Sequence, residues 1–195
     1  MAMSQENDQY LTGKLLLAMP SIGDPRFDHA VIYMCAHDEN GAMGLAINQK
    51  APGIRFDKVL EQLGIPEGVK LNFDELPQDV MHGGPVDPGR GFLLHSGDFS
   101  HKETIGINDD YGVTGTLDAL QSIIDGEGPA DYLFILGYAG WEAGQLEDEL
   151  KQNAWLVCDP DKDIIFHEAL DDKWKKAVAT LGFDPALLSG ESGSA

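Results

Sequence analysis

The segment 131–158 constrains the fold of this chain more than any other, because it leaves almost no residue outside predicted secondary structure. It begins with Tyr132–Leu136, a continuous apolar run that is long enough for a strand covered on both faces and too short for a helix. Gly137, Gly140 and Gly144 then predict a turn. The segment therefore predicts a central strand that passes through a glycine-rich turn into a helix and a second strand.

Apolar residues recur along the rest of the chain with the periods of helices and strands. Leu146, Leu150 and Ala154 lie at spacing four and predict the helix that follows the glycine-rich turn. Apolar positions and terminal glycines predict further helices over 56–63, 116–125 and 174–181. Apolar runs predict further strands over 14–19, 30–36, 42–48, 80–82, 92–95, 103–107 and 164–166.

The order of these elements predicts an α+β fold with a mixed sheet. The turn sequence 38–41 joins two of the predicted strands into a hairpin, and the strands between 80 and 95 should also be antiparallel. A chain of 195 residues with 43% hydrophobic content can bury the core of a single domain. We expect that domain over 11–188, with a flexible N-terminus over 1–10 and a disordered tail over 189–195.

Four blocks of the sequence resemble the YqgE/AlgH family of bacterial proteins. They are GKLLLAMPSIGDPRFDHAVIYMC (13–35), GAMGLAIN (41–48), HGGPVDPGRGFLLHS (82–96) and DYLFILGYAGWEAGQLEDELKQNAWLVC (131–158). The resemblance extends from about Gly13 to His167 and implies a mixed, partly curled sheet surrounded by helices. Some family members are labelled transcriptional regulators on genetic grounds. The biochemical activity of the family is not established, so the resemblance implies no catalytic residue.

The charge of the chain argues against nucleic acid and anionic membranes as partners. Thirty-three acidic residues against thirteen basic ones give a formal net charge of −20, which repels both kinds of surface. The N-terminal sequence MAMSQENDQY has no basic region followed by an apolar core, and no apolar run reaches the length of a membrane span. We therefore expect a cytoplasmic protein with no membrane association, no cofactor and no direct binding to duplex DNA.

Cysteine and histidine residues provide no spacing that is typical of a metal site. Cys35 and Cys158 each lie in an apolar run, which is typical of buried thiols in a reducing compartment. A zinc site could in principle combine Cys35 with histidines from several segments, but neither a C-x-x-C nor an H-E-x-x-H pair is present. We expect no metal. The candidate histidines are His37, His82, His95, His101 and His167.

Catalytic residues are not indicated by any motif. Ser96 follows His95, but no G-x-S-x-G sequence places a serine on a strained turn, and the same holds for Ser21 and Ser100. Carboxylates are too numerous for any pair to stand out as an acid and a base. Arg26 and Arg55 are rare cations in an acidic chain, and a solvated ion pair explains each of them.

Two glycine clusters give the most specific prediction of a site. Gly83 and Gly84 permit a close backbone approach before the rigid Pro85, and loops of this kind on a sheet often carry function. The glycines of 137–144 precede a helix but match no nucleotide-binding motif, so tight packing is the favoured explanation for them. Aromatic and amide side chains in the second cluster could anchor a partner. The predicted site comprises Gly83, Gly84, Pro85, Tyr138, Trp141 and Gln145.

The sequence therefore favours a non-catalytic cytoplasmic binding or regulatory protein that acts through a protein or small-molecule partner. Any role in transcription would be indirect. The alternative is a hydrolase that uses a cleft between the Gly83-Gly84-Pro85 loop and the Gly137–Gly144 turn. A convergence of titratable side chains in such a cleft would favour the hydrolase.

Overall fold

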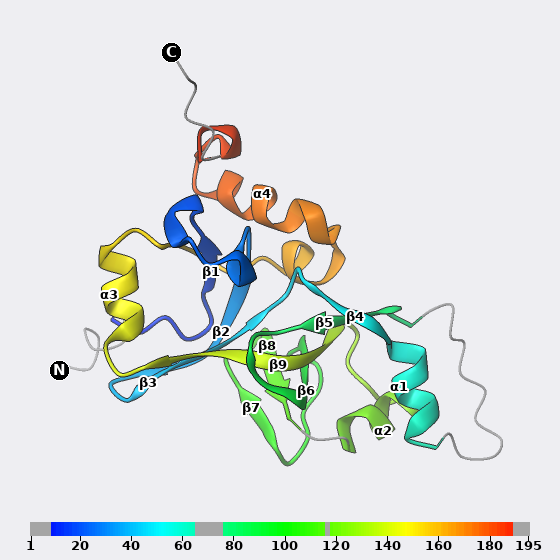
Figure 1. Ribbon diagram of the computed structural model, residues 1–195. Coiled ribbons are helices and arrows are strands. Elements are labelled where there is room, and N and C mark those ends of the chain that lie inside the picture. The colour runs from blue at the N-terminus through cyan, green and yellow to red at the C-terminus, as the bar shows by residue number, and fades with distance from the viewer. Residues whose placement is uncertain (1–8, 65–75, 116–117, 189–195) are drawn as a thin grey trace. The chain divides into compact units, whose positions relative to one another are not determined.

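The computed structural model describes residues 9–64, 76–115 and 118–188 of the chain. The chain divides into two compact units. Unit 1 comprises Met1–Asn48 and Ala139–Ala195, and unit 2 comprises Gln49–Tyr138 (Figure 1). Strand β9 (Tyr132–Glu142) begins in unit 2 and ends in unit 1.

Unit 1 contains an antiparallel sheet in the order β10-β1-β2-β3-β9, to which β9 contributes its C-terminal residues. The predicted hairpin is confirmed, because β2 and β3 pair across the turn that carries Glu39 and Asn40. Leu15, Ile32 and Leu45 are fully buried, as expected for strands without a solvent face. The strands are β1 (Leu15–Ala18), β2 (Val31–Asp38), β3 (Gly41–Ala46) and β10 (Trp155–Cys158).

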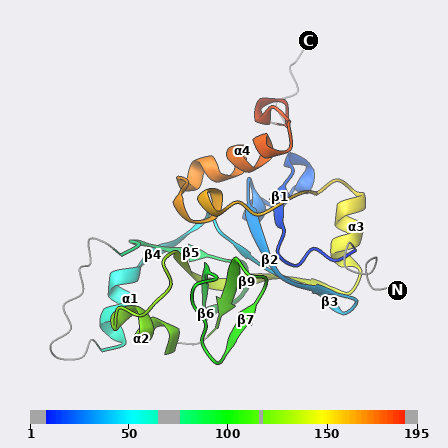
Figure 2. The same cartoon turned by 180° about the vertical axis from the view of Figure 1, so that it is seen from behind.

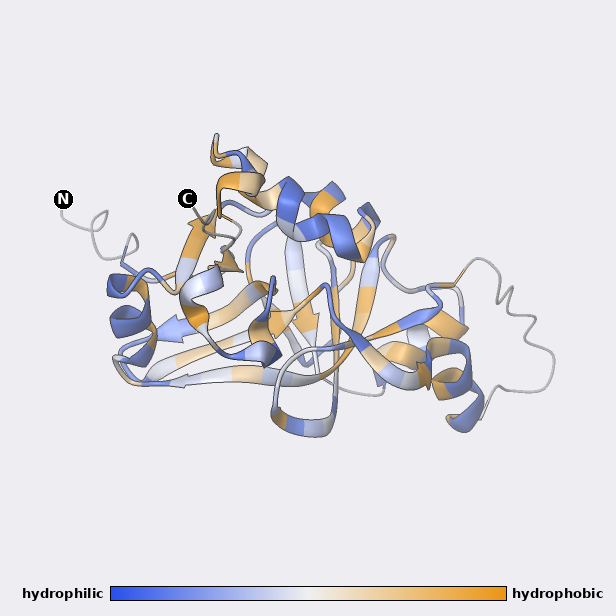
Figure 3. Cartoon of the chain, turned by 45° about the horizontal axis from the view of Figure 1, so that its top comes forward, coloured by the Kyte–Doolittle hydropathy of each residue, from blue (hydrophilic) through white to orange (hydrophobic). Residues whose placement is uncertain are grey.

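Helices α3 (Gln145–Lys151) and α4 (Leu170–Thr180) belong to unit 1 and bury one face each. Leu146 of α3 is buried in the core, and Trp174 of α4 donates its indole N–H to the carbonyl oxygen of Ala18 at 2.9 Å. Hydrophilic residues predominate along both helices (Figure 3). This amphipathic pattern explains why spacing four in the sequence predicted both helices.

Unit 2 contains a mixed sheet in the order β4-β5-β9-β6-β8-β7. Strands β5 and β9 are parallel, whereas the other neighbours are antiparallel. The α+β class and the mixed sheet are therefore confirmed. The strands are β4 (Lys50–Arg55), β5 (Asp79–His82), β6 (Val86–Ser96), β7 (Thr104–Gly106) and β8 (Tyr111–Thr114).

Helices α1 (Phe56–Gln62) and α2 (Asp118–Ile124) lie side by side in unit 2, as both views show (Figures 1 and 2). Phe56 is fully buried and its ring lies 5.5 Å from that of Phe134 on β9. Leu120 of α2 belongs to the same apolar cluster. The two short helices thus share one core with β9, which explains why neither needs to be stable alone.

Several predicted boundaries are wrong. Residues 137–142 are not a turn, because β9 continues to Glu142 and only Ala143 and Gly144 separate it from α3. Residues 164–166 lie in a helical turn, Asp163–His167, and not in a strand. Strands β4 and β8 were not predicted. No helix within the described residues is long and apolar enough to cross a membrane.

Residues 1–8 of the predicted flexible N-terminus and the predicted disordered tail over 189–195 lie outside the described residues. The extent of a single domain over 11–188 stays a prediction.

Candidate functional site

The glycines of the predicted site bring two backbone segments of unit 2 into contact. The N–H of Gly83 donates to the carbonyl oxygen of Leu136 at 2.8 Å, and a Cβ atom on Gly83 would lie 2.3 Å from the carbonyl oxygen of Gly137. Gly137 has a φ of 74°, and a Cβ atom there would lie 2.7 Å from the carbonyl oxygen of Gly84. Only glycine permits this approach. Packing therefore explains Gly83 and Gly137, and the φ of 155° at Gly84 also favours glycine; all three are buried.

Side chains next to these glycines form a surface of unit 2. Pro85 and Val86 are exposed, and Val86 lies opposite the half-buried Tyr138 in the pairing of β6 with β9. The rings of Tyr138 and the buried Phe92 are in T-shaped contact, with centroids 6.0 Å apart. We name Pro85, Val86, Tyr138 and Arg90, which contacts the same Phe92 ring as Tyr138, the Tyr138 surface. The structure thus brings together the predicted residues 83, 84, 85 and 138.

Arg90 was not predicted as a site residue, and an irregularity of β6 places it on this surface. The register between β6 and β9 shifts between Val86 and Gly91, so the intervening residues bulge and are all exposed. Asp87 in this bulge has a φ of 47°, which is uncommon outside glycine. The guanidinium carbon of Arg90 lies 5.1 Å from the ring centroid of Phe92. Arg90 therefore rests on an aromatic ring.

Trp141 and Gln145, the other two predicted site residues, lie in unit 1 and share one carboxylate. Trp141 is buried and donates its indole N–H to Oε2 of Glu149 at 2.9 Å. Trp155 donates to the same oxygen at 2.8 Å, and the Gln145 amide donates to Oε1 at 3.0 Å. Gln145 also accepts from the backbone N–H of Glu142 at 3.0 Å. These side chains therefore use their polar atoms within unit 1.

His37 joins the N-terminal segment to α3. Its Nδ1 accepts from the backbone N–H of Leu11 at 3.0 Å, so the ring proton lies on Nε2, which donates to Oε1 of Glu147 at 2.9 Å. The ring of Tyr10 makes an edge contact with the imidazole. A hydrogen bond from its own backbone N–H lowers the pKa of Glu147, and His37 adds to this effect. Both imidazole nitrogens are thus engaged.

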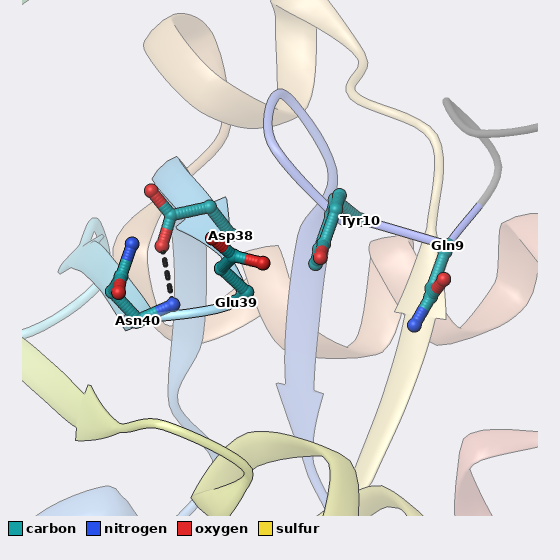
Figure 4. Close-up of a pocket in the computed structure, with 5 residues that line it drawn as sticks. All are labelled: Gln9, Tyr10, Asp38, Glu39 and Asn40. Carbon is teal, nitrogen blue, oxygen red and sulfur yellow. Dashed lines mark hydrogen bonds between the residues drawn. The ribbon is translucent and has the colours of Figure 1, made fainter.

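A hollow of about 340 Å³ lies beside this junction in unit 1. Gln9 and Tyr10 line one side, and Asp38, Glu39 and Asn40 of the β2–β3 turn line the other (Figure 4). The backbone N–H of Asn40 donates to Oδ1 of Asp38 at 2.7 Å. Among the described residues, two carboxylates and no cation line the hollow, so its charge disfavours an anionic ligand.

His95, a candidate metal ligand or base, ends a chain of hydrogen bonds inside unit 2. Its Nδ1 lies 2.9 Å from the carbonyl oxygen of Ser96, which can only accept, so Nε2 accepts from the hydroxyl of Thr114 at 3.0 Å. That hydroxyl lies 2.7 Å from the hydroxyl of Thr104, which accepts from the backbone N–H of His101. Burial lowers the pKa of His95, which is fully buried. The chain therefore fixes a neutral imidazole.

The other candidate catalytic and metal-binding side chains are hydrogen-bonded within the fold, buried, or not grouped together. The hydroxyl of Ser96 donates to Asp98. Within the described residues, no three His, Cys, Asp or Glu side chains are grouped so that they could hold a metal ion. Cys35 and Cys158 are buried as predicted, and burial raises the pKa of their thiols to about 12 and about 11.

Lys173 on α4 is a buried group that sequence analysis missed. It is 1% exposed and donates to the carbonyl oxygen of Ile165 at 2.5 Å. Burial lowers its pKa to about 8, against a smaller effect of Glu168. Its spacing from Trp174, Ala177 and Val178 on the buried face of α4 is the signal that could have identified it.

Comparison with known proteins gives the chain a family. The family model described as AlgH-like matches residues 15–186. A UPF0301 protein of Bradyrhizobium diazoefficiens is 48% identical over 190 residues, which cover 95% of this chain and 89% of that relative. A UPF0301 protein of Rhodospirillum rubrum is 44% identical, with 98% and 97% of the two chains covered.

Solved structures agree with this match. The solution structure of the AlgH protein from Pseudomonas aeruginosa is similar with a TM-score of 0.76 and 40% sequence identity, and the match covers 99% of this chain and 100% of that chain. A protein from Corynebacterium diphtheriae has a TM-score of 0.67 at 19% identity over 85% and 84% of the chains, and so shows a similar fold. Because the family model and these relatives span nearly the whole sequence, the chain belongs to the AlgH-like family.

Proposed function

We propose that this chain is a non-catalytic, cytoplasmic binding or regulatory protein whose partner docks on the Tyr138 surface. The observation that carries the proposal is the half-buried Tyr138 beside the exposed Pro85 and Val86 on paired strands. Tyrosine offers a large apolar area and a polar tip at a low cost in conformational entropy. Because Tyr138 contacts the buried Phe92, its ring is held in place before a partner arrives.

The use of titratable groups inside the fold supports binding over hydrolysis. A hydrolase needs a nucleophile that is next to a base and accessible to substrate. His95 is fully buried and Ser96 is 5% exposed. Both nitrogens of His37 are engaged as well. The burial and hydrogen bonding of these groups therefore favour a structural role for them. The exposed side chains of the Tyr138 surface favour recognition of a partner.

Regulation of transcription by this chain would be indirect. A duplex DNA partner is disfavoured because nonspecific affinity depends on neutralising phosphates, and the net charge is −20. We therefore propose a protein or small-molecule partner, and place the predicted residues Gly83 and Gly84 beneath its docking surface as packing residues. Trp141 and Gln145 lie in unit 1 and are not part of this proposed surface.

Capture from a cell extract with matched variants tests the proposal. Tyr138→Ala should reduce recovery of the partner at least several-fold. Ile105→Ala changes an exposed apolar residue elsewhere in unit 2 and should leave recovery unchanged. Equal recovery by wild type and Tyr138→Ala, with both proteins folded by circular dichroism, would contradict docking on this surface.

A further inference from the structure

Arg90 is held in position without a carboxylate partner in the part of the chain that the structure describes. Its guanidinium lies over the ring of Phe92, which is 4% exposed and therefore a fixed support. A guanidinium that stacks on a ring keeps its N–H donors free in the plane. The exposed Asp87 of the same bulge makes no ion pair with it. Arg90 therefore presents ordered donors to solvent.

The other two arginines of the chain differ from Arg90 because each forms an ion pair with a carboxylate of the same chain. Arg26 donates to Asp24 at 2.7 Å, and Arg55 donates to Asp57 at 3.0 Å. Both ion pairs form between residues two apart in the sequence, so they need no partner from outside. Against 33 acidic residues, an ordered arginine without such a pair is the feature of this surface that remains unexplained by folding.

We propose that Arg90 binds an Asp or Glu side chain of a partner protein, in a segment whose apolar side chain packs on Val86 and Tyr138. A carboxylate matches the planar fork of a guanidinium and forms two parallel hydrogen bonds with it. Val86 is 38% exposed, and Tyr138 lies opposite it, so apolar contact is available beside the charge. This inference rests on the proposed function and specifies the chemistry of the partner.

The net charge of the chain adds a second property to this partner. A charge of −20 attracts basic surfaces and repels polyanions over distances of about one Debye length, roughly 8–10 Å. A nucleic acid could supply an anion for Arg90 but meets this repulsion throughout. A basic protein surface that carries one carboxylate satisfies both requirements. We therefore assign the partner to this class.

Site-specific photo-crosslinking in cells provides the test. The full chain carries p-benzoylphenylalanine in place of Val86, and the crosslinked peptide is identified by mass spectrometry. We expect one protein, crosslinked through a segment that contains Asp or Glu within a basic surface. Arg90→Glu should reduce the crosslink at least tenfold, whereas Arg90→Lys should reduce it less. Lys102→Glu makes the same charge change at an exposed residue of unit 2 and should have no effect.

A charge exchange separates recognition from damage to the fold. Replacing the partner carboxylate by arginine should abolish the crosslink to wild type and restore the crosslink to Arg90→Glu. A crosslinked protein whose yield does not depend on Arg90, or whose segment lacks a carboxylate, would overturn this inference and leave the proposed function standing. A crosslink only to nucleic acid or to a second copy of the chain would also overturn it. No crosslink from Val86 would overturn both proposals.

Discussion

Tyr138 and Trp141 lie on the same strand and each follows a glycine, yet the two aromatic residues have different surroundings. Trp141 is 7% exposed and donates its indole N–H to Glu149, which helix α3 supplies. Tyr138 is only half-buried, beside a bulge of β6 that supplies an arginine with no carboxylate partner among the described residues. The comparison shows that the neighbouring element, and not the glycine–aromatic pattern, decides whether such a residue serves the core or a surface.

Truncation of the two aromatic side chains should give the largest difference between these regions. Trp141→Ala removes a buried indole that contacts Trp155 and should lower the free energy of unfolding by about 3–5 kcal/mol. Tyr138→Ala should lower it by less, about 1–2 kcal/mol, because that ring is only partly buried. Urea unfolding followed by circular dichroism measures both values. Equal losses would show that Tyr138 is also a core residue.

Lys173 allows a test of how unit 1 tolerates a buried charge. Its folded-state pKa of about 8 lies below the ordinary value of 10.5, so the unfolded chain binds more protons between these values and stability rises with pH. The rise amounts to roughly 3–4 kcal/mol, because one pKa unit corresponds to about 1.4 kcal/mol. Below pH 8 the cost of burying the charge is fully present.

The measurement compares wild type with Lys173→Met. Burial raises the pKa of Cys35 and Cys158, so these thiols lower the stability of both proteins above about pH 9 and cancel in the difference. The stability of wild type relative to Lys173→Met should increase between about pH 7 and pH 10. Lys175→Met changes an exposed lysine of the same helix and should show no such trend. A constant difference for Lys173→Met would mean that its ammonium is solvated.

Replacing Glu149 tests whether its hydrogen bond to the indole N–H stabilises Trp141 in the core. Glu149→Ala leaves the indole N–H groups of Trp141 and Trp155 without their acceptor, which should cost about 2 kcal/mol of stability. Glu149→Gln keeps one oxygen and should cost less. Glu142→Ala, at an exposed residue, should change stability by no more than about 0.5 kcal/mol. Urea unfolding monitored by tryptophan fluorescence measures the free energy of unfolding of each variant. An unchanged stability of Glu149→Ala would mean that water replaces the carboxylate.

Much of the fold could be predicted because the apolar residues of the predicted elements are the residues that the structure buries. Leu16 and Ile32 lie in continuous apolar runs, and both are fully buried in strands. The same rule fails at 164–166, where an apolar run of similar length forms a helical turn that contributes Ile165 to the core. It also fails for β4, whose Pro52 and Gly53 usually interrupt strands and whose residues are mostly exposed. Short segments take their conformation from their neighbours.

The candidate site could be predicted only in part, because the conformation of its segments also depends on their neighbours. Gly83 follows β5 and lies against Gly137 of β9, next to Tyr138, but the sequence could not show that Gly137 lies within a strand. Glycine signals a turn and a close backbone approach equally well. Arg90 lay among turn-forming residues, and its stacking on Phe92 depends on the bulge. Arg26 and Arg55 form the local ion pairs that were expected.

Replacing Arg90 should have the smallest effect on stability among these replacements. Its stacking on Phe92 takes place in solvent, where such contacts are worth about 0.5–1 kcal/mol, and no hydrogen bond of the fold depends on it within the described residues. Arg90→Ala should therefore lower the free energy of unfolding by about 0.5 kcal/mol, close to the effect of Arg26→Ala as a control. Urea unfolding under the conditions used for Trp141→Ala gives the value. A loss of about 2 kcal/mol or more would mean that Arg90 maintains the bulge of β6. The bulge and Tyr138 would then belong to the structural framework, as Trp141 does, and the two regions would no longer differ.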